Sequence, residues 1–208
     1  MSILWPCPLT VDEYAASGRA VRVPRPECPR CLGPVVFWSG YWRHVRWQQR
    51  ERKIFIPRVR CRGCGVSHAL LPAFVLARRL DAAESAGLVI GQVAAGAYGV
   101  RPAAAAAGVP ARGWVRRFAA RAGELAVSFS ALAVELGGEV VRLLPDPLRS
   151  AVAAIGAAFT AAAGLPGWAV LGRWRFASAV TGGSLLAANA TSPWLVIGSR
   201  RFMPPRSP

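Results

Sequence analysis

Two pairs of cysteines stand out in the sequence because their spacing suits metal binding. Cys28 and Cys31 form one Cys-x-x-Cys pair, Cys61 and Cys64 form another, and 29 residues separate the pairs. A Cys-x-x-Cys turn directs two sulfur atoms at one point, and two such turns brought together supply the four thiolates of a tetrahedral zinc site. The four cysteines are therefore the predicted ligands of a structural Zn²⁺ ion.

The segment between the cysteine pairs must form a hairpin to bring them together. Residues 35–38 and 41–47 are rich in β-branched and aromatic side chains, so we expect an outgoing strand interrupted at Ser39 and Gly40. Residues 52–60 predict the returning strand, with a turn over residues 48–51. Pro57 lacks a backbone donor, which places the returning strand at the edge of its sheet.

The chain is strongly basic, with 26 Lys and Arg against 10 Asp and Glu, a net charge of +16 and a pI near 11.5. Between residues 19 and 79 there are fourteen basic residues and two acidic ones. Such an imbalance is self-repulsive unless a polyanion neutralises it, and nucleic acid is the usual polyanion. The alternative is that these side chains only solvate a small domain.

Strand alternation places most of the hairpin's charge on one face. Phe55, Val59 and Cys61 are expected on one face of the returning strand, and Ile54 and Ile56 share the other face with arginines. Trp42 and Trp47 lie among these basic residues. The predicted nucleic-acid contacts of the hairpin are Arg43, Arg46, Arg52, Lys53, Arg58 and Arg60.

A helix-turn-helix is predicted after the hairpin. Asp81 and Glu84 have capping-box spacing ahead of a helix over about residues 82–97, and residues 101–107 form a second, short helix. Gly108 and Pro110 break the chain before a helix over about residues 111–126. A helix, a glycine turn and a second helix is the arrangement that places the second helix in the major groove of DNA.

The last of these helices is amphipathic and basic. Its apolar residues recur at helical spacing and are expected to pack inward, while its arginines project elsewhere. Arginine near the start of a recognition helix can contact a guanine with two hydrogen bonds. The predicted base contacts are Arg112, Arg116 and Arg117, and Arg101 is expected to contact the backbone at the start of the preceding helix. The alternative is an ordinary amphipathic helix with a basic face.

Residues 127–208 carry few motifs. Asp146 followed by Pro147 predicts a helix start, and Gly164 predicts its end. The uncharged run over residues 150–163 is shorter than the roughly 20 residues that a membrane span requires, so a buried helix is expected. This third of the chain would pack onto the helix-turn-helix; the alternatives are a homodimer interface or a surface that docks a separately encoded transposase. The tail with Arg200, Arg201 and Arg206 is expected to be disordered.

Several strings of the sequence resemble a known kind of protein. They are residues 39–46 (SGYWRHVR), residues 58–64 (RVRCRGC), and residues 68–72 (HALLP) together with residues 78–81 (RRLD). They look like a family of small proteins of GC-rich bacteria that resemble the N-terminal part of insertion-sequence transposases, a zinc ribbon followed by a helix-turn-helix. The resemblance covers about residues 20–125. It implies the four paired cysteines as zinc ligands and the helix after Gly108 as the reading helix.

No catalytic constellation is evident. Two-metal cleavage of DNA needs carboxylates on a sheet, whereas Glu124, Glu135, Glu139 and Asp146 lie in sequence with a helical pattern. The two histidines, His44 and His68, are expected to be polar surface or hydrogen-bonding residues, or alternatively zinc ligands in place of a cysteine. The fifth cysteine, Cys7, is expected to be an inert, partly buried thiol, or alternatively a substitute ligand or redox site. We therefore expect no enzymatic activity and no small-molecule substrate.

The sequence thus predicts an α+β protein with four parts: an N-terminal arm (1–24), a four-cysteine zinc ribbon (25–68), a helix-turn-helix (69–126) and a helical C-terminal segment (127–208). The absence of a recognisable signal peptide and the unpaired fifth cysteine predict a cytoplasmic, nucleoid-associated protein without a membrane span. The expected function is sequence-specific binding of double-stranded DNA as a transposon-associated accessory or regulator. The alternatives are a subunit or remnant of a split transposase, an RNA-binding zinc ribbon, and a membrane-tethered regulator.

Overall fold

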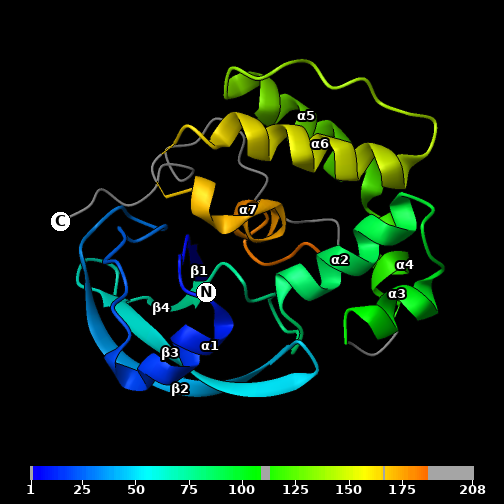
Figure 1. Cartoon of the computed structure of the whole chain (residues 1–208). Helices are drawn as coiled ribbons and strands as arrows, with labels where there is room; N and C mark the ends of the chain where they lie inside the picture. Colours follow the sequence, from blue (N-terminus) through cyan, green and yellow to red (C-terminus); the bar gives the residue numbers. More distant parts are fainter. Residues whose placement is uncertain (1, 109–112, 166, 187–208) are drawn as a thin grey trace.

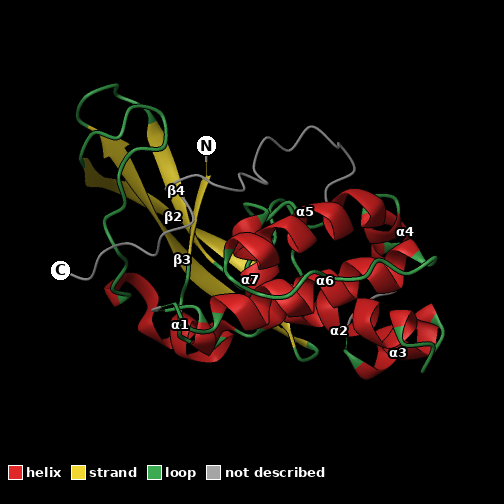
Figure 2. Cartoon of the chain, turned by 90° about the horizontal axis from the view of Figure 1, so that it is seen from above, coloured by secondary structure: helices red, strands yellow, loops and turns green. Residues whose placement is uncertain are grey.

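A computed structural model describes residues 2–108, 113–165 and 167–186. The chain has the expected α+β architecture, with a curved four-stranded sheet on one side and a group of helices on the other (Figure 1). Viewed from above, the sheet and the helices lie side by side (Figure 2). Each side has its own cluster of buried residues, which we call the sheet core and the helical core.

The sheet has the strand order β1-β4-β3-β2. Strands β2 (Val35–Trp47) and β3 (Arg50–Cys61) form a long antiparallel hairpin, joined by a turn in which Gln48 and Gln49 both have positive φ. Two residues with positive φ give a hairpin turn whose twist matches that of the strands. Strand β4 (Ser67–Pro72) pairs antiparallel with β3, and β1 (Ser2–Trp5) pairs parallel with β4.

Two predictions about the hairpin are wrong. Ser39 and Gly40 do not interrupt the outgoing strand, because a bulge between Phe37 and Ser39 absorbs the irregularity and the pairing continues. The returning strand is not at the edge, since β3 lies between β2 and β4. Pro57 is tolerated there because β4 pairs with β3 only from Arg58 onward, so no ladder bond is required of the proline on that side.

The N-terminal segment is also not a loose arm. Strand β1 extends the sheet, and the short helix α1 (Val11–Ser17) packs on β3. Thr10 and Glu13 form a capping box at the start of α1, and Tyr14 donates its hydroxyl proton to the carbonyl oxygen of Phe55 at 3.1 Å. This bond supplies a partner for the carbonyl group of Phe55, which lies in the part of β3 that does not pair with β4. A single 3-10 turn, η1 (Gly18–Ala20), follows.

The helical side contains α2 (Ala83–Ala94), α3 (Val100–Ala106), α4 (Trp114–Ala119), α5 (Ala122–Glu135), α6 (Pro147–Ala162), the 3-10 turn η2 (Ala169–Leu171) and α7 (Arg173–Val180). The single helix predicted over residues 111–126 is two helices, because the chain turns between α4 and α5. Residues 109–112, including Arg112, lie outside the described residues, as do Arg200, Arg201 and Arg206.

The capping box predicted at the start of α2 is not formed. Ala82 occupies the N-cap position and makes no side-chain cap bond. Asp81 instead pairs with Arg46 at 3.0 Å, and Glu84 pairs with Arg175 of α7. Both carboxylates have arginine partners from distant parts of the chain, which a local sequence motif does not reveal.

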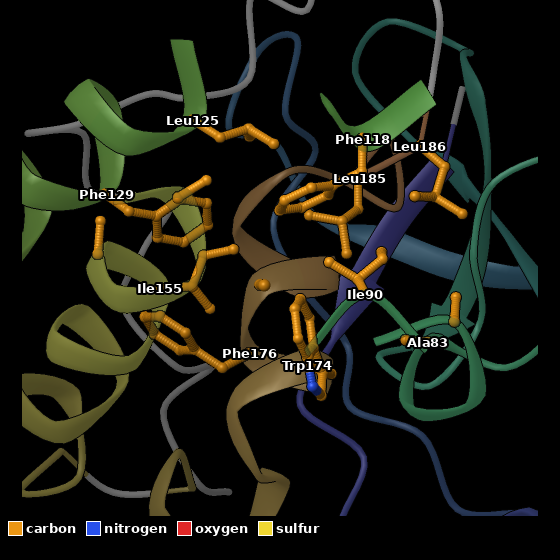
Figure 3. Packing of buried hydrophobic residues seen from close by; sticks show 14 of the residues in the cluster. Ala83, Ile90, Phe118, Leu125, Phe129, Ile155, Trp174, Phe176, Leu185 and Leu186 are labelled. Atoms are coloured by element: carbon orange, nitrogen blue, oxygen red, sulfur yellow. The ribbon is translucent and has the colours of Figure 1, made fainter. Parts of the chain in front are cut away.

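The C-terminal third completes the helical core, as expected. Asp146 accepts hydrogen bonds from the backbone N–H groups of Leu148 and Arg149 and caps α6, which runs beside α5. Side chains from α2, α4, α5, α6 and α7 interdigitate; among them Phe118, Phe129, Ile155, Trp174 and Phe176 gather around one centre (Figure 3). Among the described residues, no helix is long and apolar enough to cross a membrane.

Candidate metal centre and basic surface

The structure brings the four predicted ligands together. The sulfur atoms of Cys28, Cys31, Cys61 and Cys64 all lie within 4.8 Å of one another, with Cys28 Sγ 3.6 Å from Cys64 Sγ and Cys31 Sγ 3.4 Å from Cys61 Sγ. Zinc–sulfur bonds of about 2.3 Å in a tetrahedron require sulfur–sulfur separations of roughly 3.8 Å. The cluster is therefore of the right size for a metal ion such as zinc.

The two Cys-x-x-Cys turns are built on the same hydrogen-bond pattern. In the first, Cys28 N–H donates to Gly33 O at 3.0 Å and Leu32 N–H donates to Cys28 O at 2.8 Å. In the second, Cys61 N–H donates to Val66 O at 2.9 Å and Gly65 N–H donates to Cys61 O at 3.1 Å. The two equivalent turns bring four sulfur atoms together, the ligand set of structural rather than catalytic zinc centres.

The sulfur atoms have unequal proton affinities. Hydrogen bonds from backbone N–H groups stabilise the thiolate of Cys61 and lower the pKa of Cys61 to about 6. The largest effect comes from the N–H group of Cys64, whose nitrogen lies 3.5 Å from Cys61 Sγ. At Cys31 a backbone hydrogen bond from Gly33 acts in the same direction, but the neighbouring thiols of Cys61, Cys64 and Cys28 outweigh it and raise the pKa to about 11. Four thiolates this close repel one another, so a cation is needed for all four to be ionised together.

His68 contacts the cluster without belonging to it. Its side chain is fully buried, and Nε2 lies 3.4 Å from Cys28 Sγ. Burial lowers the pKa of His68, which favours the neutral imidazole. The tautomer of the neutral ring with its proton on Nε2 can donate to the Cys28 thiolate and would orient it, as outer-shell partners of metal ligands commonly do. His68 is thus a buried hydrogen-bonding residue and not a surface one, while His44 is exposed and pairs with Glu51.

Cys7 lies apart from the cluster in the sheet core. It is completely buried, and burial raises the pKa of its thiol to about 12. A thiol held in its protonated form reacts slowly with oxidants and binds metal poorly. The expectation of an inert thiol agrees with this environment.

Leu32 provides a test of the first turn. Its φ of 59° matches the 70° of Gly65 at the equivalent position of the second turn, and its side chain is 63% exposed. A left-handed conformation costs a non-glycine residue about 1 kcal/mol or more, and an exposed side chain contributes little packing in return. We expect Leu32→Gly to raise the urea midpoint of the metal-loaded protein and Gly65→Ala to lower it. A lower midpoint for Leu32→Gly would show that the leucine side chain stabilises the turn.

Three of the predicted nucleic-acid contacts have intramolecular partners. The guanidinium of Arg43 is mostly buried and donates to the carbonyl oxygens of Leu76, at 2.7 Å, and Arg79, and burial lowers its pKa. Arg46 pairs with Asp81 and Arg52 pairs with Asp12. These side chains hold the segment after β4 and helix α1 against the hairpin, so their charge is already partly compensated.

The other cations of the hairpin are exposed. Arg58, Arg60 and Lys53 have exposed side chains, whereas Ile54 and Ile56 between them are completely buried in the sheet core. Lys53 lies on the opposite face of β3, so the face predicted to be basic carries exposed charge only at its end near the cysteines. At the other end it packs inward, because helix α1 and the segment before α2 add apolar partners that the strand pattern alone does not show.

Of the arginines predicted for the reading helix and the helix before it, the three that the structure describes lie in a small helical unit. Helices α3 and α4 both pack against α2, and the three lie together in the structure (Figure 1). Arg101 at the start of α3 and Arg116 in α4 are exposed, and Arg117 is half-buried. Trp114, Val115 and Phe118 of α4 are buried, as the sequence predicts.

Sequence reasoning missed the exposed aromatic residues of β2. It singled out Trp42 and Trp47, but Trp47 is half-buried, while Phe37, Trp38 and Tyr41 are exposed beside Trp42. The signal was present, since four aromatic residues within six positions exceed what one buried face of a strand can use. The assumed interruption at Ser39 and Gly40 concealed it.

Comparison with known proteins gives one match. A family model described as a domain of unknown function, DUF6431, matches residues 28–104. The match begins at the first cysteine ligand, spans β2, β3, β4 and α2, and ends within α3. No curated protein and no solved structure matches the chain.

Proposed function

We propose that this protein is a zinc-stabilised, sequence-specific DNA-binding protein that acts as a transposon-associated accessory or regulator. Zinc at the four cysteines would hold the base of the hairpin closed, and α2, α3 and α4 would form the unit that contacts the duplex. The association with transposons rests on the sequence resemblance of residues 20–125 to the N-terminal part of insertion-sequence transposases.

The observation that carries the proposal is the two-sided character of α4. The helix buries Trp114, Val115 and Phe118 in the helical core and leaves Arg116 exposed, and it follows Gly113, whose φ is 65°. A short helix anchored by aromatic residues, with arginine on its outer face, is suited to the major groove. Helices α3 and α4 both pack against α2, which supports the proposed helix-turn-helix.

The remaining cations would position the protein on DNA. Arg101 lies at the start of α3, and Arg58 and Arg60 lie on the hairpin, all with exposed side chains. Contacts from such residues to phosphates fix orientation and add affinity at any sequence, whereas contacts to base edges discriminate between sequences. In this proposal Arg116, Arg117 and Arg112 contact bases, and the other cations bind the backbone.

The test separates sequence preference from affinity. Zinc-loaded protein is used to enrich sheared genomic fragments at moderate salt, and the recovered fragments are sequenced. We expect a short recurring motif for the wild type and a roughly tenfold or greater loss of preference for that motif in Arg116→Gln, since one good arginine–guanine pair discriminates by about 1–3 kcal/mol.

Arg142→Gln is the matched control, because Arg142 is exposed outside the α2–α4 unit and the variant loses the same charge. It should keep the motif and weaken all sequences equally. Recovery of fragments without any motif, or an equal loss of preference in both variants, would contradict the proposal.

A further inference from the structure

Strand β2 carries a row of exposed aromatic side chains. Phe37, Trp38, Tyr41 and Trp42 are 48%, 59%, 40% and 41% exposed, respectively, and we refer to them as the β2 aromatic surface. All four lie within six consecutive residues of one strand. Large aromatic side chains contribute most to stability when buried, so four exposed ones on one edge strand mark a binding site. The site includes both faces of the strand, because Trp42 packs with Phe55 and Trp38 lies beside Arg60, and side chains 55 and 60 point to opposite faces of β3.

Cations accompany the rings of this surface. Arg60 lies over Trp38 at 4.9 Å, Lys53 over Trp42 at 5.6 Å, and Arg25 over Phe37 at 5.7 Å from the ring centroids. Arg19 lies 5.6 Å over Phe55, which packs edge-on against Trp42. The cations come from separate segments, two from β3 and two from the region before the first cysteine pair, so the alternation of rings and positive charges is created by the fold.

The position of β2 leaves this surface accessible. The sheet order places β2 at an edge, with β3 as its neighbour in the sheet. Consecutive strand residues advance by about 3.3 Å, so the surface extends over roughly 15–20 Å, which matches a few nucleotides of an extended strand. The ligand that this surface fits must therefore be elongated, negatively charged and able to stack.

We propose that the β2 aromatic surface binds single-stranded nucleic acid by stacking on unpaired bases. Phosphates interact with the arginines and the lysine, and bases stack on the indole and phenyl rings or on the guanidinium planes above them. Stacking tolerates every base because each has a flat π face, so this surface contributes little sequence preference. The ligand chemistry is a phosphodiester chain with exposed bases, which both DNA and RNA provide.

This inference goes beyond the proposed function and does not depend on it. Base reading in the duplex uses α4 of the helical side, with Arg58 and Arg60 of the hairpin adding only phosphate contacts, whereas unpaired bases contact the rings of β2. A protein with both surfaces would bind a duplex next to an unpaired segment. Each surface is tested with its own ligand and its own variants, so the failure of one leaves the other standing.

The first experiment needs no variant. Binding of the zinc-loaded full chain to a labelled 12-nucleotide oligo(dT) is compared with binding to an abasic 12-mer of the same charge, by fluorescence anisotropy. Stacking on two or more bases should make oligo(dT) bind at least tenfold more tightly, because each stacked base contributes substantially. Equal affinities would overturn the proposal, since charge alone would then explain the binding. Oligo(U) of the same length identifies RNA or DNA as the better source of bases.

The second experiment assigns the binding to β2. Trp38→Ala should weaken oligo(dT) binding roughly tenfold and leave abasic binding almost unchanged, because it removes a ring and no charge. Tyr98→Ala is the matched control, as Tyr98 is also an exposed aromatic residue, 54% exposed, but lies between α2 and α3. The variant Trp38→Phe should retain most of the affinity. An equal loss for Trp38→Ala and Tyr98→Ala, or no loss for either, would contradict the assignment.

Discussion

Removal of the metal is expected to unfold the sheet side of the protein. Cys28 and Cys61 belong to the sheet core, and the two cysteine turns join the strand that begins at Val35 to the end of β3. Structural zinc binding contributes about 10–16 kcal/mol in small zinc domains, which is comparable to the whole stability of a typical protein. We expect a chelator to abolish the hydrogen-exchange protection of residues 35–72, and Cys28→Ser to have the same effect without a chelator.

The matched control for the cysteine substitution is Cys7→Ala, because Cys7 is equally buried but lies outside the four-sulfur cluster. This variant should bind one Zn²⁺ per chain, as the wild type should, and should keep its protected amides. Elemental analysis of the purified proteins measures the stoichiometry directly. A wild type that contains no metal, and whose protection does not change with a chelator, would refute the metal centre.

Arg175→Met is expected to cost about 3–5 kcal/mol of unfolding free energy, the usual penalty for leaving a buried partner charge alone. Arg175 is 8% exposed; it pairs with Glu84 of α2, donates to Leu9 O at 2.8 Å and lies over the ring of Phe74. One guanidinium thus links the helical side to the sheet side. The free energy of unfolding, measured with urea on metal-loaded protein, tests the prediction.

The pH dependence of this variant has a defined sign. Burial already raises the pKa of Glu84, although Arg175 opposes the rise. Without the arginine the carboxyl group should keep its proton in the folded state and lose it on unfolding, so the stability of the variant falls as pH rises above the usual glutamate range. The deficit relative to wild type should therefore be smaller at pH 5 than at pH 7.5.

Two further variants distinguish the buried charge from a loss of packing. Arg173→Met removes an exposed arginine of the same helix and should cost less than about 1 kcal/mol. The double variant Glu84→Leu/Arg175→Met removes both charges and should recover much of the deficit, because no buried carboxylate remains. A double variant as unstable as Arg175→Met alone would show that packing, and not the unpaired charge, is responsible.

The sequence by itself determined the features that depend on short-range geometry. The spacing within each Cys-x-x-Cys pair fixes a tight turn, and four cysteines in two such turns leave few arrangements other than one cluster. Asp146 and Pro147 determined the start of α6 in the same local way. The inward side of α4 followed from the helical spacing of Trp114, Val115 and Phe118, because that periodicity is a property of one helix.

Only the tertiary structure decided which charged and aromatic side chains are engaged. In the sequence, Arg43, Arg46 and Arg58 are all arginines in strands of the same hairpin. In the structure, Arg43 and Arg46 bond to the segment after β4, more than thirty residues away in the chain. Asp81 and Glu84 do not form the predicted cap but pair with arginines of β2 and α7. A buried ion pair between distant segments outweighs a local cap, which contributes only about 1 kcal/mol. The exposure of the β2 aromatic residues likewise depends on the strand order, since the edge position of β2 is set by long-range pairing.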